Sequence, residues 1–414
     1  MAFGIALSGI DAAQSDLNVT ANNIANSATT GFKSSHSQFS ELFAVSPQGV
    51  SNTQTGNGVK LASIAQTFTQ GNITNTGNSL DLALSGNGFF VLSDGGALQY
   101  SRAGSFSTNS SGYVVNSAGQ HLKVFQPTAT GSFNTTSLSD LQLVTGDSPP
   151  NASTTAQMIF NLPANASAPA GTPFSPTDST TYNQSTSLTL YDSLGAAHTA
   201  SLYMVKAATP NVWHAYEYID GTAVNATPVA LTYSSGGILS GVVDAAGGTN
   251  NAAVSFGPYT PTTGAAAMSA TFDLSKTTQY GNAFGVTSVT QDGFTTGKLS
   301  GISVDTTGVV QANYTNGRST PLGQVAIANF ADQQGLQQVG NTNWLQTFAS
   351  GSALYGPAGA SGFGNIQSGS LEASNVDITA QLVNMITAQR NFQANAQMIS
   401  TENQITQTII QIHG

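Results

Sequence analysis

The chain has 414 residues, of which 7% are charged, 44 are glycine and none is cysteine. Its length suggests two or three domains, the lack of cysteine excludes disulfides and thiol chemistry, and nine scattered Lys and Arg residues make nucleic acid and anionic membranes poor partners. Ordinary soluble domains carry about 25% charged residues, so this polar, weakly charged surface suits either a protein that packs against its own copies or a secreted glycine-rich β protein.

The N-terminal residues carry no recognisable secretion or membrane signal. No Lys or Arg precedes Lys33, whereas a cleaved secretory signal needs a positive segment followed by an apolar core. No run approaches the roughly 20 apolar residues of a membrane-spanning helix. We therefore expect no membrane insertion, and we expect an exported chain to leave by a route that cleaves no such signal.

The first predicted element is a helix with a heptad apolar stripe. Its apolar residues are spaced four, three, seven and seven apart, as on one face of a helix, and they are Phe3, Leu7, Ile10, Leu17 and Ile24. The segment from Asn26 to Gly31 is expected to end the helix, with Gly31 in the left-handed backbone region.

Between about residues 59 and 369 the sequence predicts short β-strands. Apolar and polar residues alternate at 188–190 and 200–204 on either side of a turn at 193–195, and a strand rich in aromatic residues follows at 212–219. Asn-Gly pairs at 87–88 and 316–317 predict further turns. No helix-length periodic run occurs here, so the chain is predicted to be α at both ends and β between them.

The last predicted element is a long helix over 378–412. Alternating steps of four and three place one stripe on Ile378, Leu382, Met385, Gln389, Phe392, Ala396 and Ile399. Ser374 or Asn375 is expected to cap the helix, with Asp377 in its first turn. The polar face of this helix is rich in Asn and Gln, and beyond Asp377 its only charges are Arg390 and Glu402.

Two helices with one apolar stripe each are marginal when isolated in water. We expect them to pair as a coiled-coil stalk and to pack against neighbouring copies, with mainly-β inner and outer domains between them; the fold class is multidomain. The amide-rich face lacks the Glu–Lys pairs of a solvated helix, which favours contact with other helices or a neutral channel wall. The alternative is a folded monomer whose terminal helices cap a β core.

No motif predicts a catalytic, cofactor-binding or metal site. Residues 86–88 lack the third glycine of a dinucleotide fingerprint, and residues 293–298 are one residue short of a phosphate-binding loop. The five histidines are dispersed, although Asp192 lies six residues from His198 across the predicted hairpin. We expect both glycine motifs to be turns, and we expect neither enzyme activity nor a cofactor.

Residues 8–33 read SGIDAAQSDLNVTANNIANSATTGFK. This stretch resembles the N-terminal signature of the flagellar rod, hook and hook-associated protein family, which has Ser-Gly, a heptad leucine, Asn-Asn-Ile-Ala-Asn and Thr-x-Gly-Phe-Lys. The matching residues are Ser8, Gly9, Leu17, Asn22, Asn23, Ile24, Ala25, Asn26, Thr29, Gly31, Phe32 and Lys33. The match is long and gapless, and it is therefore specific.

Two later regions resemble the same family. Residues 81–92 and 100–122 are similar to its β segments after the stalk, with Arg102, Gly104 and Phe106 as hallmarks. Its C-terminal signature is matched by Leu371, Glu372, Ser374, Asn375, Val376, Met385, Gln389, Arg390, Asn395 and Ala396. The resemblance covers nearly the whole chain and is weakest from about residue 146 to residue 287.

The middle of the chain distinguishes branches of this family. Residues 188–206, 294–317 and 321–336 resemble hook subunits, whereas rod proteins usually lack so large a middle region. The resemblance implies a structural subunit of the flagellar hook, a curved and flexible hollow tube that transmits torque from rod to filament. Two alternatives remain open: a stiff distal-rod protein of the same family, and a secreted β-rich adhesin from a different class.

The resemblance also implies a domain plan and partners. The plan has a helical stalk forming the inner tube (1–30 with 370–414), a linker (31–75 with 358–369), an inner β domain (76–145 with 286–357) and an inserted outer β domain (146–285). The implied partners are copies of the chain, the distal rod, the hook cap, the hook–filament junction proteins, the flagellar type III export apparatus and the hook-length control protein. The implied location is the flagellar hook outside the cell.

The residues expected to carry assembly all lie on the stalk helices. On the first helix they are Leu7, Ile10, Leu17, Asn22, Asn23 and Ile24, with Asn26 just after it. On the second helix they are Ile378, Leu382, Met385, Arg390, Phe392, Asn395 and Ile399.

Overall fold

A computed structural model describes residues 2–42, 56–143, 146–244, 248–250 and 253–413. The chain divides into two compact units. Unit 1 comprises Met1–Thr145, Gly301–Asn313 and Ser319–Gly414, and unit 2 comprises Gly146–Ser300 and Tyr314–Arg318. Unit 1 holds both terminal helices and a β body, whereas unit 2 is mainly β.

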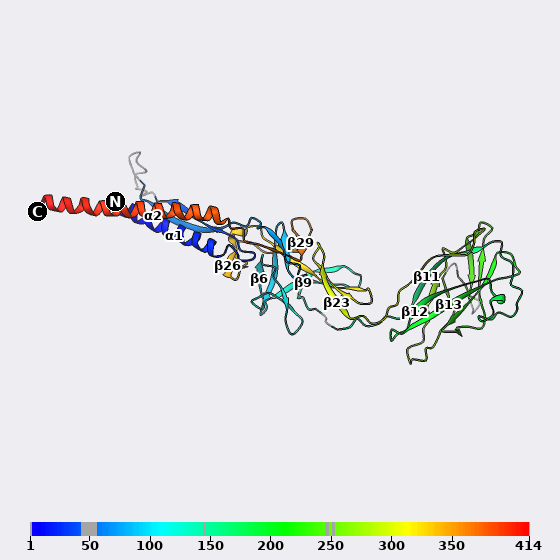
Figure 1. The fold of residues 1–414 in the computed structure, drawn as a ribbon. Helices are drawn as coiled ribbons and strands as arrows, with labels where there is room; N and C mark the ends of the chain where they lie inside the picture. The colour runs from blue at the N-terminus through cyan, green and yellow to red at the C-terminus, as the bar shows by residue number, and fades with distance from the viewer. Residues whose placement is uncertain (1, 43–55, 144–145, 245–247, 251–252, 414) are drawn as a thin grey trace. The chain divides into compact units, whose positions relative to one another are not determined.

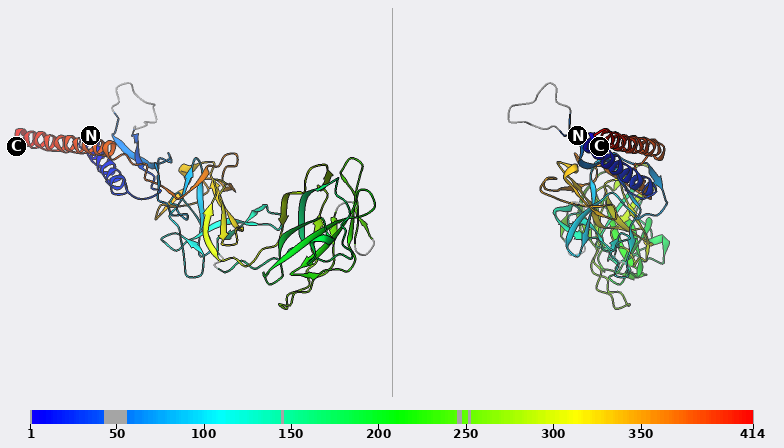
Figure 2. Two further views of the ribbon diagram at one scale, coloured as in Figure 1. Left: turned by 45° about the vertical axis from the view of Figure 1, so that its right-hand side comes forward. Right: turned by 90° about the vertical axis from the view of Figure 1, so that its left-hand side faces the viewer.

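The two long helices are α1 (Ala2–Ala25) and α2 (Ile378–His413), and they lie side by side in unit 1 (Figures 1 and 2). Between them, the described residues form only two short 3₁₀ helices, η1 (Ser179–Thr181) and η2 (Gln333–Gly335). The predicted order of helix, β region and helix is therefore confirmed. Neither α1 nor α2, as far as the structure describes them, is long and apolar enough to cross a membrane.

The helix ends follow from local chemistry. The predicted stop after α1 is confirmed, and Gly31 has a φ of 68°; a Cβ there would also lie 2.4 Å from the Ala103 backbone nitrogen. The predicted cap of α2 at Ser374 or Asn375 is wrong. Asp377 is the N-cap instead, because its Oδ1 accepts hydrogen bonds from the Thr379 and Ala380 amides at 2.8 and 3.2 Å.

The β body of unit 1 is built on one large sheet. Its main path runs β23-β24-β25-β9-β5-β6-β27-β26, with β7, β8, β10 and β28 paired at its sides. The bounds are β5 (Phe89–Asp94), β6 (Ala97–Ser101), β7 (Ser107–Thr108), β8 (Val114–Val115), β9 (His121–Pro127), β10 (Phe133–Asp140), β23 (Leu299–Val304), β24 (Val309–Tyr314), β25 (Ser319–Asn329), β26 (Gln337–Gly340), β27 (Asn343–Leu345) and β28 (Leu354–Pro357).

Three two-stranded sheets complete unit 1, and two of them join the two halves of the chain. β3 (Ile73–Asn75) pairs with β30 (Ser370–Glu372), and β4 (Leu82–Ser85) pairs with β29 (Asn365–Ser368), both antiparallel. The third sheet is a hairpin of β1 (Ser35–Glu41) and β2 (Val59–Gln66) beside α1. Segments near the two ends of the sequence therefore pair with each other in unit 1.

Strand β5 organises the core of this β body. Phe89 and Val91 pack on one face with Tyr100 and Trp344, whereas Phe90 and Leu92 pack in a separate cluster on the other face. A strand whose successive side chains are all buried must be covered on both faces. This burial explains the continuous apolar run at the start of β5.

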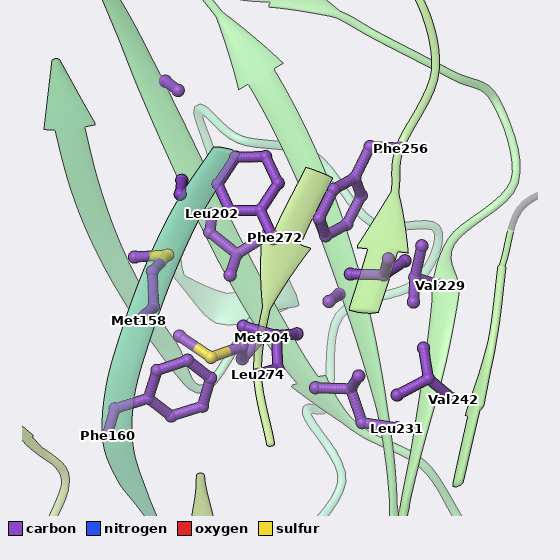
Figure 3. Packing of buried hydrophobic residues seen from close by; sticks show 14 of the residues in the cluster. Met158, Phe160, Leu202, Met204, Val229, Leu231, Val242, Phe256, Phe272 and Leu274 are labelled. Atoms are coloured by element: carbon purple, nitrogen blue, oxygen red, sulfur yellow. The ribbon is translucent and has the colours of Figure 1, made fainter. Parts of the chain in front are cut away.

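Unit 2 consists of two packed sheets. The first sheet is β12 (Gln184–Tyr191), β13 (Ala197–Lys206), β14 (Val212–Ile219), β15 (Thr222–Ala223), β16 (Val229–Tyr233), β17 (Leu239–Val243) and β18 (Thr249–Asn250). The second sheet is β11 (Thr155–Pro163), β19 (Ala253–Ser255), β20 (Thr271–Asp273), β21 (Thr278–Tyr280) and β22 (Gly285–Gln291). Figure 3 shows the buried side chains between them, with Phe160, Met204 and Phe272 among the largest.

The predicted hairpin in this unit is confirmed, because β12 and β13 pair antiparallel around Gly195, which has a φ of 83°. One predicted boundary differs from the observed one. We expected the outer domain to end at residue 285, but β22 pairs antiparallel with β11 and therefore belongs to unit 2. The chain returns to unit 1 at Gly301.

Candidate assembly surface

The helices α1 and α2 pack antiparallel along one seam. The Asn23 side-chain amide donates a hydrogen bond to Gln381 Oε1 at 3.2 Å, and a Cβ added to Gly9 would lie 2.6 Å from Asn395 Oδ1. Gly9 and Asn23 are therefore as far apart on α1 as Gln381 and Asn395 are on α2. This common spacing defines the register of the pair.

The α1 side of the seam is made of small and polar residues, and not of the predicted apolar stripe. Ala6, Ala13, Thr20 and Asn23 are buried, and they share the face of Gly9 at steps of three, four and seven. The close approach of Asn395 to Gly9 leaves no room for a side chain at that point. Small residues thus let the two helix backbones come close together.

On α2, the seam includes only one half of the predicted apolar stripe. Ala388 is buried, and the half-buried residues at the same spacing are Gln381, Met385, Phe392, Asn395 and Ile399. Ile378 and Leu382 lie at the other side of the stripe and remain exposed. The amide-rich face, expected to contact other helices or to line a channel, contributes Gln381 and Asn395 to the seam.

Both helices expose a row of large apolar side chains next to the seam. On α1, Phe3 and Leu7 are exposed, and Ile10, Leu17 and Ile24 continue the row half-buried. On α2, the row contains Ile378, Leu382 and Ile386. At 3.6 residues per turn, each row lies roughly 100° from its seam, and in an antiparallel pair both rows face the same side. We call this surface the apolar row.

The opposite side of α1 is covered by the β1–β2 hairpin. Ser8 Oγ accepts a hydrogen bond from the Val59 amide at 3.2 Å, and a Cβ on Gly58 would lie 2.2 Å from Ser8 Oγ. The Asn23 side chain both accepts from the Ser35 amide at 2.9 Å and donates to the Ser35 carbonyl at 2.7 Å. The hairpin therefore leaves the apolar row uncovered.

The C-terminal part of α2 extends beyond α1. In the observed register Ala2 lies level with Glu402, so the last eleven residues of α2 have no α1 residue opposite them (Figures 1 and 2). Ile405, Ile409 and Ile410 are exposed on this extension. A helix that extends past its partner helix and exposes isoleucines on its last turns is a surface suited to a further helix.

Three charged side chains meet where the helices join the β body. Lys33 Nζ lies 2.6 Å from Glu372 Oε1, and an Arg102 guanidinium nitrogen lies 3.5 Å from Glu372 Oε2; all three side chains are buried. The Gly71 amide also donates a hydrogen bond to Glu372 Oε1, and Lys33 Nζ donates one to the Thr69 carbonyl. Burial lowers the pKa of Lys33, and the negative charge of Glu372 opposes this shift. We call this group the junction cluster.

The predicted assembly residues therefore fall into different groups. The residues in the seam are Asn23, Met385, Phe392, Asn395 and Ile399. Those in the apolar row are Ile10, Leu17 and Ile24, which are half-buried beside the seam, and Leu7, Ile378 and Leu382, which are exposed. Asn22 and Asn26 line a polar pocket of about 560 Å³ at the end of α1, and Arg390 is exposed. The role of these residues in assembly stays a prediction. Sequence reasoning missed the small residues of the seam, which have no hydrophobic signal.

Among the described residues, the arrangement most similar to a catalytic site is in unit 2. His198 Nδ1 lies 2.6 Å from Asp220 Oδ2, and His198 Nε2 lies 3.2 Å from Asp192 Oδ2. Both ring nitrogens are therefore held by carboxylates, and neither is left to activate a nucleophile. Within the described ranges, no group of three or more His, Cys, Asp or Glu side chains is arranged to hold a metal ion.

Models of four protein families match successive parts of the chain. The family described as flagella basal body rod protein matches residues 3–33, and the flagellar hook protein FlgE/F/G D1 domain matches residues 83–150. The flagellar basal body protein FlaE D2 domain matches residues 161–294. The flagellar basal body rod FlgEFG protein C-terminal family matches residues 367–412.

Whole-length relatives and a solved structure agree with these matches. The flagellar hook protein FlgE of Salmonella typhimurium is 39% identical over 428 aligned positions, and that of Escherichia coli K12 is 40% identical over 420; each alignment covers 100% of both chains. FlgE of Borreliella burgdorferi is 31% identical over 98% of both chains. The crystal structure of Helicobacter pylori FlgE2 shares the fold over 72% of this chain and 100% of its own, with a TM-score of 0.52 at 15% identity.

Proposed function

Because the chain belongs to the flagellar hook protein family, whose members are structural subunits of the bacterial hook, we propose that it polymerises into a curved, flexible hollow tube that carries torque from rod to filament. The helix pair forms the inner tube, and the β body and unit 2 form successive outer layers. The matches favour neither a distal-rod protein nor an adhesin, because the full-length relatives are hook proteins.

The apolar row supports this proposal most directly. Five large apolar side chains, Phe3, Leu7, Ile378, Leu382 and Ile386, are exposed along two helices that already pair with each other. Burying a Leu, Ile or Phe side chain contributes about 1.5–3 kcal/mol. An isolated monomer leaves these side chains in water, whereas neighbouring copies in a tube would bury them at every subunit.

The low charge of the chain supports a flexible tube. Copies that slide past one another during bending must break and re-form their contacts, and strong ion pairs would resist this. With charged residues at only 7%, most contacts would be between small polar and apolar groups, which exchange partners at little cost. The amide-rich surface of α2 suits either helix contacts or the wall of a channel.

The remaining domain plan and partners are part of the same proposal. The segments 31–75 and 358–369 link the stalk to an inner β domain, and the inserted unit lies outside it. The tube contacts the distal rod below, and the hook cap or the hook–filament junction proteins above. The flagellar type III apparatus exports the chain without cleaving a signal, and the hook-length control protein stops its growth. Intact-mass measurement of extracellular protein should then show no loss of N-terminal residues.

Electron microscopy of purified, assembled protein tests the central claim. The wild-type chain should form curved hollow tubes, while Leu382→Asp should abolish them, because a charge in the apolar row would be buried without a partner at each contact. Leu382 is exposed in the single chain, so the variant should keep the far-UV spectrum and the melting transition of the wild-type monomer.

Asn391→Asp is the matched control, because Asn391 is exposed on another face of α2 and the change adds the same charge. This variant should still assemble. Straight short rods formed by the wild-type chain would favour a rod protein, and a strictly monomeric wild-type chain would contradict polymerisation altogether. Normal tubes from Leu382→Asp would show that the apolar row lies outside the subunit contacts.

A further inference from the structure

We propose that Phe348 is an assembly knob, which inserts into the apolar face of the β1–β2 hairpin on a second copy of this chain. The inference rests on the proposed function, because it names a contact within the polymer. Phe348 lies between β27 and β28 and has a relative exposure of 104%, so its ring touches almost nothing in its own chain.

The turn that carries Phe348 is held in place by hydrogen bonds. Ser350 is fully buried; its Oγ donates to the Thr347 carbonyl at 2.9 Å and accepts from the Thr347 amide at 3.0 Å. Thr347 Oγ1 donates to the Gly335 carbonyl at 2.5 Å, which ties the turn to η2. A Cβ on Gly335 would lie 2.4 Å from the Ser350 nitrogen, so η2 and the turn are in direct contact.

The chain on both sides of the turn is also anchored. Trp344 is buried before it, and Ala353 packs after it against the same cluster of apolar residues. A fully exposed aromatic ring on such a turn has already lost much of the backbone freedom that binding would otherwise cost. Rigid aromatic side chains are typical anchors of protein interfaces for this reason.

The described part of unit 1 offers two groups of large exposed apolar side chains outside its helices. One group, Val339, Phe348 and Leu354, surrounds the turn along the sequence, and the other group, Phe39, Leu61 and Ile64, lies on the β1–β2 hairpin. Two different patches on one chain favour a head-to-tail contact between copies. Contacts of this kind generate a ring when the rotation between copies closes and a helical polymer when it does not.

The hairpin register gathers its three apolar residues on one face. Phe39 lies directly opposite Leu61, and Ser37 lies opposite Ile64, with a register shift between Gln38 and Phe39. Residues 37 and 39 share a strand face, and cross-strand partners share it with them. The shift therefore places Leu61 and Ile64 on the face of Phe39, where they form a receiving surface for an aromatic ring.

Cysteine cross-linking in assembled tubes tests this contact, and the absence of native cysteine leaves no competing thiol. Tubes of Phe348→Cys/Leu61→Cys should give a ladder of disulfide-linked copies under mild oxidation, whereas the same variant as a dilute monomer should not. Phe348→Cys/Thr130→Cys is the control, because Thr130 is exposed on another turn of unit 1. This control should give no ladder.

Assembly kinetics give a second measurement. Phe348→Ser should raise the critical concentration for tube formation at least tenfold, Phe348→Tyr should stay within twofold of wild type, and neither should shift the melting transition of the monomer. Tubes that form normally without a ladder from the Phe348/Leu61 pair would overturn the inference and leave the proposed function intact. Failure of the wild-type chain to form tubes would instead overturn the proposed function.

Discussion

Lys33 Nζ lies 2.6 Å from Glu372 Oε1, although the two residues are 339 positions apart in the sequence. Lys33 follows α1, Glu372 precedes α2, and Arg102 from the β body joins them. Each of these residues belongs to a different stretch that resembles the flagellar axial family. The junction cluster shows what these stretches have in common: they meet at one buried site that ties both helices to the β body.

Replacing Glu372 with Gln should destabilise this junction strongly. The change keeps the shape of the side chain but leaves the charges of Lys33 and Arg102 buried without a counter-ion, which costs about 3–5 kcal/mol. The free energy of unfolding of the monomer, measured by denaturant titration, should fall by this amount. Glu41→Gln is the control, because Glu41 is exposed on β1 and should change stability by less than about 0.5 kcal/mol. Equal effects of the two variants would contradict the role of the junction cluster.

Phe392→Asp should separate assembly from folding of the β domains. Phe392 lies in the seam beside buried Ala388, so a carboxylate there would be buried against α1 or a neighbouring copy at a cost of several kcal/mol. Polymerisation and motility should be lost, and Ile399→Asp should behave in the same way.

The thermal transition of the secreted Phe392→Asp monomer should barely change, and Phe392→Leu should assemble. Gln397→Asp, on the exposed amide surface of α2, should be milder if that surface lines an aqueous channel. If Phe392→Asp instead melts the β domains, the helix pair belongs to one cooperative fold with them, and the stalk is not a separate assembly element.

Glu217 should make the stability of unit 2 depend on pH. Its carboxyl is buried on β14, Oε1 has no hydrogen-bond partner among the described residues, and burial raises its pKa to about 8. The folded protein therefore holds a proton that the unfolded chain loses above about pH 4.5. The free energy of unfolding of unit 2 should therefore be highest, as far as Glu217 is concerned, below that pH. It should fall as pH rises towards 8, by at most about 1.4 kcal/mol per pH unit.

Glu217→Gln keeps the hydrogen-bonding shape of the neutral acid and should remove this slope. Unfolding free energies measured between pH 4.5 and 8.5 should therefore be higher for the variant at the alkaline end and similar at the acid end. A wild-type slope that survives in Glu217→Gln would assign the pH dependence to another group.

His198 should add a second pH dependence in the same unit. Burial alone would lower the pKa of His198, but hydrogen bonds to Asp220 and Asp192 outweigh burial and raise it. The stabilisation is therefore present below pH 6.5 and is lost as pH rises through the raised pKa. The pKa values of Asp192 and Asp220 are lowered by contacts that outweigh burial, so their contribution is lost when pH falls below about 4.

His198→Gln should cost roughly 1.5–3 kcal/mol at pH 5.5, which is typical of hydrogen bonds to charged groups, and less at pH 8.5. The unfolding free energies should be measured in a protein that also carries Glu217→Gln. The contributions of Glu217 and His198 are both lost as pH rises, and this second substitution removes the contribution of Glu217. A cost that is equal at the two pH values would mean that the histidine acts only through packing.

The sequence alone was sufficient to predict those elements whose structure depends on residues close together in the sequence. The ends of α1, the span of β14 and the β12–β13 turn follow from periodicities of 3.6 and 2 residues and from glycines with positive φ, all of which act over a few positions. The resemblance was sufficient for the family, because its signatures are short and contiguous. Neither the local periodicities nor the family signatures depend on which distant segments of the chain contact each other.

Tertiary structure decided the rest. On α1 the seam lies on small residues such as Gly9 and Ala13, and not on the apolar stripe, because close backbone approach and not hydrophobicity selects that face. The junction cluster, the His198 carboxylate pair and the exposed turn at Phe348 likewise join residues far apart in the chain. A local pattern states how hydrophobic a face is, but only the packed fold determines which face is covered and which is left for another copy.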